Sequence, residues 1–162
     1  MVVNPKKNSF SLSNIFSFRP FSEKRILSLQ KSLIESIGNA EEFSHSLIRV
    51  RTQKQKNFAV KEAHQHVKEL RKNLKQALAS TKYLRNNGRG EIKKYNFFDY
   101  LYGSCGLILS MTEQISVPHS KSLQWKDKIE EIEEKVGSEG IIGQCSEMID
   151  LLEAYTSRES FK

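Results

Sequence analysis

Apolar residues recur at helical spacing along this chain from residue 22 onward. The first series advances by three or four residues and consists of Ile26, Leu29, Leu33 and Ile37. That spacing predicts a helix with one buried face. Ser22 is suited to cap its start and Gly38 to end it in a left-handed conformation. Asn39, followed three residues later by Glu42, then predicts the start of a second helix.

The most regular series lies between residues 60 and 84. Its steps alternate between three and four residues, and its members are Val60, Ala63, Val67, Leu70, Leu74, Ala77, Thr81 and Leu84. This heptad seam predicts a long helix. Extended backward, the seam falls on polar residues in the window 49–57, so we expect a break or a change of face there. The Asn86–Gly90 segment, which reads NNGRG, predicts the end of the helix.

A third apolar segment runs from Phe97 to about Gln114, with Asn96 and Asp99 as candidate caps. Its apolar residues point in nearly every direction around a helix, which predicts the central and most buried helix of the fold. Gly103 and Gly106 lower helix propensity. We expect them where another backbone approaches closely.

Two more helices complete the prediction. Pro118 closes the third segment, after which one apolar stripe comprises Leu123, Trp125, Ile129, Ile132 and Val136, and another comprises Ile141, Ile142, Cys145, Met148, Ile149, Leu152 and Tyr155. The Gly137–Gly143 segment between them superficially resembles a phosphate loop, but no strand precedes it and no suitable lysine follows, which favours a turn between helices. The predicted fold class is all-α, an antiparallel bundle of about five helices over residues 22–156, with a tail at 157–162.

Residues 1–21 differ from the rest. They contain three basic and no acidic residues. Apolar residues at even positions alternate with serines at odd positions, which is the period of a strand; the apolar residues are Phe10, Leu12, Phe16 and Phe18 and the serines are Ser9, Ser11, Ser13 and Ser17. No continuous apolar stretch follows Lys6 and Lys7, which argues against a secretory signal peptide. We therefore expect either an N-terminal arm, docked or mobile, or a targeting segment.

Charge divides the chain into two halves. Residues 1–94 hold 20 Lys and Arg against 7 Asp and Glu, whereas residues 95–162 hold 6 against 12, so a charge of +13 is followed by −6 and the total is +7. Such asymmetry suggests an anionic partner for the basic half. The alternative is that the acidic half folds back onto the basic half and neutralises part of it.

A stripe of lysines is the most distinctive candidate site. Lys61, Lys68, Lys75 and Lys82 are seven residues apart and share the outer face of the seam helix. Arg71, Lys72 and Arg85 widen this stripe. The full candidate set for binding an anionic partner is Arg49, Arg51, Lys54, Lys56, Lys61, Lys68, Lys72, Lys75 and Lys82. Cations about 10 Å apart along a helix suit an extended polyanion. The plainer interpretation is a solvated face that keeps the bundle soluble.

No residue pattern predicts catalysis, a cofactor or a metal site. His64 and His66 point away from each other on a helix, and Glu42 with His45 has suitable spacing but no second such motif. Cys105 and Cys145 lie on apolar stripes and are expected to be buried, reduced thiols. Their separation of 40 residues also permits a disulfide if the chain is exported. A disulfide framework is excluded by two cysteines, and the sequence contains no run of 18 apolar residues.

The leading functional hypothesis is therefore a non-catalytic protein-interaction module, such as an adaptor, an assembly subunit or a delivered effector. Its partner would be another protein or a second copy paired through the Val60–Leu84 seam. Nucleic-acid binding through the lysine stripe is the alternative. An anionic membrane surface ranks third as a partner, and an enzyme ranks last. We expect a cytoplasmic protein, unless residues 1–21 direct it to an organelle or to secretion.

Overall fold

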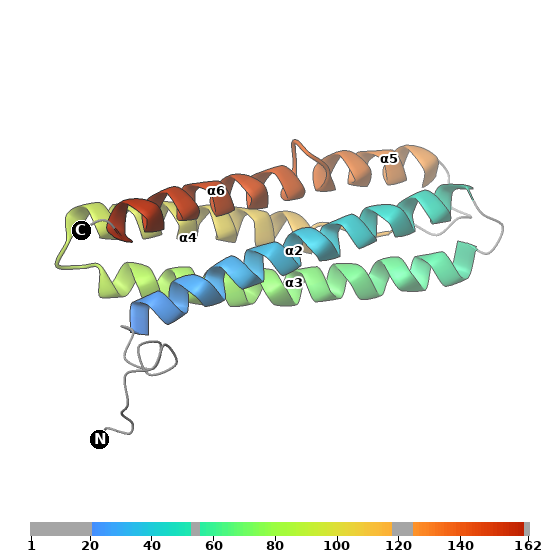
Figure 1. Cartoon of the computed structure of the whole chain (residues 1–162). Helices are drawn as coiled ribbons and strands as arrows, with labels where there is room; N and C mark the ends of the chain where they lie inside the picture. The colour runs from blue at the N-terminus through green and yellow to red at the C-terminus, as the bar shows by residue number, and fades with distance from the viewer. Residues whose placement is uncertain (1–20, 53–55, 118–124, 161–162) are drawn as a thin grey trace, which may run out of the picture.

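The computed structural model describes residues 21–52, 56–117 and 125–160, and these residues form helices and turns without a strand. The helices are α2 (Phe21–Thr52), α3 (Lys56–Asn87), α4 (Ile92–Glu113), α5 (Trp125–Val136) and α6 (Ile141–Ser160). The all-α prediction is confirmed. The five segments make four rods rather than five, because α5 and α6 follow one another along one line (Figure 1).

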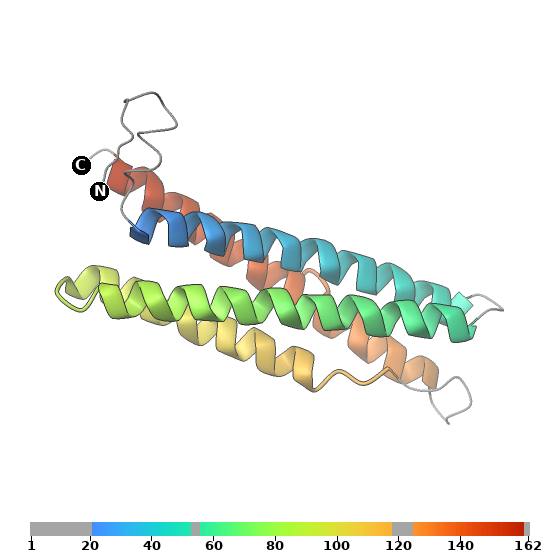
Figure 2. The same ribbon diagram turned by 90° about the horizontal axis from the view of Figure 1, so that it is seen from below.

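The four rods run alternately up and down, as short connections between neighbouring helices require. α2 and α3 form a long hairpin, and α4 returns beside α3 (Figure 2). The rod formed by α5 and α6 lies across the bundle from α3 and packs chiefly against α2. Figure 2 shows α3 between α2 and α4, so one side of α3 faces outward.

Helix α2 is continuous through Gly38, and the predicted stop there is wrong. Gly38 is exposed, and a Cβ at this position would meet nothing within 4 Å. Leu33 before it and Ala40 and Phe43 after it are fully buried on one face. A glycine costs about 1 kcal/mol in a helix interior, which is small beside the burial of these side chains. Packing on both sides of Gly38 therefore carries the helix past it, and the predicted start at Asn39 is wrong as well.

The predicted interruption near residues 49–57 is confirmed, since α2 ends at Thr52 and α3 begins at Lys56. The heptad seam of α3 is also confirmed. Seven of its eight members are buried, and Val60 is half-buried against the core. The helix ends at Asn87, as the NNGRG segment predicts. Because the seam packs within the molecule, it is not free for a second copy.

Helix α4 differs from its prediction in two ways. It begins at Ile92, with Glu91 at the cap position, so Asn96 and Asp99 lie inside the helix and cap nothing. It is also not the central helix, because it packs on α3 and, less extensively, on α6. Tyr100 is 53% exposed and Leu107 is 59% exposed. An apolar composition on all sides thus gave the wrong position, since one side of α4 faces outward.

The predicted close approach at the α4 glycines is not found. A Cβ on Gly103 would meet nothing within 4 Å, and one on Gly106 would meet only a side-chain methyl of Leu78, at 3.9 Å.

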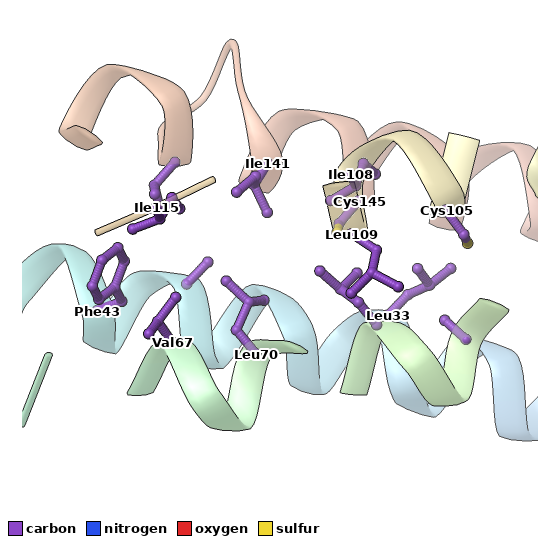
Figure 3. Packing of buried hydrophobic residues seen from close by; sticks show 14 of the residues in the cluster. Leu33, Phe43, Val67, Leu70, Cys105, Ile108, Leu109, Ile115, Ile141 and Cys145 are labelled. Atoms are coloured by element: carbon purple, nitrogen blue, oxygen red, sulfur yellow. The ribbon is translucent and has the colours of Figure 1, made fainter. Parts of the chain in front are cut away.

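All five segments contribute to one hydrophobic core. In Figure 3, Phe43 of α2 and Val67 of α3 lie opposite Ile115. Leu70 of α3 lies opposite Ile141 of α6, and Leu33 of α2 lies opposite a group that consists of Ile108, Leu109 and Cys145. Leu33, Phe43, Leu70, Ile108 and Ile141 are each fully buried. The buried stripes expected in α5 and α6 are present, with Ile129, Ile132 and Val136 in α5 and Ile141, Cys145, Met148 and Leu152 in α6.

The Gly137–Gly143 segment joins α5 to α6, as predicted, rather than forming a phosphate loop. The amides of Gly140 and Gly143 both donate hydrogen bonds to the carbonyl of Gly137, at 2.9 and 3.4 Å. A Cβ on Gly140 would lie 1.9 Å from the carbonyl oxygen of Lys135. This turn therefore requires glycine because the backbone passes too close for a side chain.

Several predictions about the fold fall wholly or partly on residues outside the described ranges. They concern the arm or targeting segment at residues 1–21, the stop at Pro118 and the apolar position Leu123. At the C-terminus, α6 runs to Ser160, four residues beyond the predicted end of the last helix.

Candidate functional site

The outward side of α3 carries a row of exposed lysines, Lys61, Lys68, Lys75 and Lys82, here called the lysine row. The heptad seam turns its apolar residues inward, so lysines repeating with the same period share one outer line. At 1.5 Å per residue, consecutive members are about 10 Å apart along the helix.

In the described part of the chain, no ion pair includes a lysine of the row. Within residues 21–52, 56–117 and 125–160, no carboxylate oxygen lies within 4.0 Å of these four amines. The two glutamates of α3 are half-buried, and Glu62 pairs with Arg49 of α2. The acidic helix α5 packs on α2 and α6. The positive charge of the row therefore faces solvent.

The other predicted anion-binding residues are arranged differently. Arg49 lies 3.2 Å from Glu62, and Arg51 lies 3.2 Å from Glu133 of α5. Both arginine side chains are about one-third exposed (34%). Their charges are thus partly neutralised within the fold, because α2 faces α3 on one side and α5 on another.

Lys72 is exposed, but it borders a shallow pocket between α2 and α3 that also contains Glu35, Glu42 and Glu69. Its surroundings are therefore mixed in charge. Lys54 lies outside the described residues, and only the backbone of Lys56 is described. Of the nine predicted residues, the structure brings together the four of the lysine row.

The side of α3 next to the lysine row holds α4 in place. Arg71 donates hydrogen bonds from Nε and Nη2 to the carbonyl of Thr112, at 3.1 and 2.6 Å, and from Nη2 to that of Ile115 at 3.1 Å. Arg85 lies 3.3 Å from Asp99, and its guanidinium carbon is 4.3 Å from the centre of the Tyr102 ring. These two arginines, which the sequence grouped with the basic stripe, are therefore structural contacts.

The outward face of α4 was missed from the sequence. It is uncharged from Tyr100 to Thr112, and its exposed members are Tyr100, Gly103, Leu107 and Ser110. These residues are three or four apart, so they lie on one side of the helix. The sequence does contain an indication of this exposed face. Gly103 and Ser110 are small residues that lie on the same side of the helix as Tyr100 and Leu107. A buried core line would be filled by larger side chains.

The two cysteines are placed as buried thiols, as expected. Burial raises the pKa of Cys105 from 9.0 to about 12, and a hydrogen bond with Thr81 opposes this only in part. Burial also raises the pKa of Cys145 to about 12, and the proximity of Cys105 adds to it. The Sγ of Cys105 lies 3.8 Å from the Sδ of Met148. Such thiols have little thiolate at neutral pH and are poor nucleophiles.

The three histidines in the described ranges do not gather with other ligands. His45 and His64 are exposed on different helices, and His66 is half-buried. In the described segments, no group of three His, Cys, Asp or Glu side chains is arranged to hold a metal ion. Among those same segments, no helix combines the length and apolar character needed to cross a membrane.

Comparisons of the chain with protein-family models, curated proteins and solved structures gave no match.

Proposed function

We propose that this chain is a non-catalytic protein-interaction module that binds an anionic partner protein through the lysine row. The observation that carries the proposal is the exposure of Lys61, Lys68, Lys75 and Lys82 along one line, with no carboxylate within 4.0 Å in the described residues. Potentials of opposite sign steer association and set orientation between proteins. The burial and raised pKa of both thiols argue against either cysteine as a nucleophile.

A protein partner is favoured over a nucleic acid by the neighbouring face of α4. This face exposes Tyr100 and Leu107. Tyrosine and apolar side chains are typical of the desolvated part of protein interfaces. Contacts to phosphates alone need no such surface.

The test is affinity capture with the full chain from its source cell, with and without nuclease. The variant changes all four lysines of the row to Glu. Its matched control changes four other exposed lysines, Lys24, Lys31, Lys126 and Lys128, so both proteins go from +7 to −1. We expect protein partners that survive nuclease with the wild type and the control and are lost with the row variant. Equal capture by the row variant and the control would contradict the proposal.

Nucleic-acid binding is the second candidate, since the row spaces four cations evenly along α3. This candidate predicts that affinity for a duplex falls steeply with salt. A row that neutralises four phosphates gives a slope of about −3.6 in log K against log salt. The measurement is a titration of duplex DNA and duplex RNA at several salt concentrations. A shallow slope, or one unchanged in the row variant, would rule this candidate out.

A further inference from the structure

The lysine row runs along the edge of α3 that adjoins α4. Three of its members each precede by three residues a side chain that contacts α4. Lys68 precedes Arg71, which donates a hydrogen bond to the carbonyl of Thr112. Lys75 precedes Leu78, which lies beside Gly106. Lys82 precedes Arg85, which forms an ion pair with Asp99. Residues three apart are neighbours on a helix surface. Lys68, Lys75 and Lys82 therefore stand beside α4 rather than on the far side of α3.

The exposed face of α4 is uncharged, and it begins beside α3. Gly103 and Ser110 on this face lie three and four residues from Gly106, which approaches Leu78 of α3. Tyr100 and Leu107 are seven residues apart and more than half exposed. Gly103 lies between them and has open space where a Cβ would stand. Two apolar side chains with a gap between them can receive a side chain from a partner. Asp99 and Glu113 mark the two ends of this uncharged stretch.

Together these residues form what we call the α3–α4 surface, made of Lys68, Lys75 and Lys82 from α3 and Tyr100, Gly103 and Leu107 from α4. We propose that the α3–α4 surface binds an acidic amphipathic helix of a partner protein. Its carboxylates face the three lysines, and its apolar side chains lie on Tyr100 and Leu107. This inference rests on the proposed function and specifies its partner.

The dimensions of the surface fit a short helix. From Lys68 to Lys82 the row spans 14 residues, or about 21 Å, which matches a partner helix of four turns. Acidic residues at every seventh position of that helix would meet successive lysines. An apolar line on one face of a helix is the recognition element expected for such a surface.

Other occupants fit the charges and shape less well. A second copy using the same surface would bring two lysine rows together, and like charges facing each other oppose association. Membrane insertion calls for a continuous line of bulky apolar side chains, whereas here Gly103 leaves a gap between only two. A nucleic acid would match the lysines but leave the α4 face unused.

The experiment uses the full chain and a fluorescein-labelled peptide of three heptads, with Leu at positions a and d and Glu at e and g. Binding is followed by fluorescence anisotropy. We expect saturable binding, weakened roughly tenfold or more by the triple change of Lys68, Lys75 and Lys82 to Glu and roughly fivefold or more by Leu107→Glu.

Matched controls exist for both changes. Changing Lys24, Lys126 and Lys128 to Glu alters the net charge equally on other helices, and all three are exposed. Ile34→Glu places the same new charge at an apolar residue of α2 that is 58% exposed, against 59% for Leu107. Both controls should keep the wild-type affinity within about twofold, since exposed sites outside an interface contribute little. Circular dichroism confirms that every variant is folded.

Several results would overturn the inference. One is the absence of binding at about 100 μM peptide, a concentration at which even weak specific contacts are detected. Another is equal binding of a scrambled peptide of the same composition. If the lysine change weakens binding but Leu107→Glu does not, the inference fails while the proposed function stands.

Two further measurements, with duplex RNA and with lipid vesicles, show whether the proposed function fails together with this inference. Tight, row-dependent binding of duplex RNA with no peptide binding would overturn both the inference and the proposed function. The same holds for sedimentation with phosphatidylserine vesicles that depends on Leu107, because a lipid surface would then be the partner.

Discussion

Arg71 shows how a single side chain can differ from its apparent role in the sequence. It appears to belong to a basic stripe, yet its guanidinium donates three hydrogen bonds to carbonyls at the end of α4. The last carbonyls of a helix lack partners within the helix and carry partial negative charge. Arg71 therefore closes the end of α4 and ties it to α3.

Replacing this arginine should destabilise the fold. We expect Arg71→Ala to lower the free energy of unfolding by about 2 kcal/mol, since hydrogen bonds from charged groups are worth more than neutral ones. Arg71→Lys should recover only part of the loss because an ammonium cannot bond two carbonyls in the same planar arrangement. Urea unfolding followed by circular dichroism measures both. Lys72→Ala, at the exposed neighbouring residue, is the control and should change little; an equal loss there would contradict the assigned role.

At the scale of the elements, glycines illustrate where local preference yields to packing. Gly38 lies inside α2 with open space around it, whereas Gly140 lies where the chain passes close to the carbonyl of Lys135. The sequence assigned turns to both. Only the second is a turn, because buried residues on both sides of Gly38 hold one helical face together.

These two glycines should respond to alanine in opposite ways. Gly38→Ala should raise the free energy of unfolding by about 1 kcal/mol, because alanine favours the helix and meets no neighbour. Gly140→Ala should lower it by about 2 kcal/mol or more, since a Cβ 1.9 Å from the Lys135 carbonyl forces the turn to move. Thermal and urea unfolding of both variants and of the wild type measure these changes in the free energy of unfolding. A loss of stability in Gly38→Ala would show that the helix bends there.

Helix α4 shows the limit of composition as a guide to position. Its apolar residues predict a central helix, but only Phe98, Leu101, Cys105, Ile108 and Leu109 among them are buried. Among the described residues, each of the four rods has a side that no other rod covers. The choice of neighbours in the bundle decides which helix has an apolar side that faces outward. The periodicity of apolar residues does not encode that choice.

Across the whole molecule, charge is distributed by the packing order. The acidic half does fold onto the basic half, through Arg51 with Glu133 and Arg85 with Asp99. These ion pairs neutralise positive charge on α2 and at the contact between α3 and α4. It does not reach the lysine row, because α5 lies against α2 and α6.

Because of the two buried thiols, the free energy of unfolding should vary with pH in the alkaline range. Both have a folded-state pKa of about 12, against 9.0 ordinarily. The folded state therefore holds these protons more tightly, and the resulting stability is complete below pH 9 and is lost as the pH rises from 9 toward 12. We expect the free energy of unfolding to fall more steeply over this interval in the wild type than in the Cys105→Ala, Cys145→Ala double variant.

The double variant also controls for other effects of alkaline pH, because the two proteins differ only at the two cysteines. The comparison uses the slope with pH, not the absolute stability, because removing two sulfur atoms from the core lowers stability at every pH. Parallel curves for the two proteins would contradict the assigned burial of the thiols.

The sequence by itself determined the all-α class, the interruption before α3, the seam of α3 and the outward position of its lysines. Each follows from the period of a helix, which fixes how neighbouring residues share a face. Tertiary structure alone decided that α2 runs through Gly38, that Arg71 and Arg85 hold α4, and that α4 presents an apolar side to solvent next to the lysines. These outcomes depend on which helices become neighbours, and that choice is made by the packing of all the rods together.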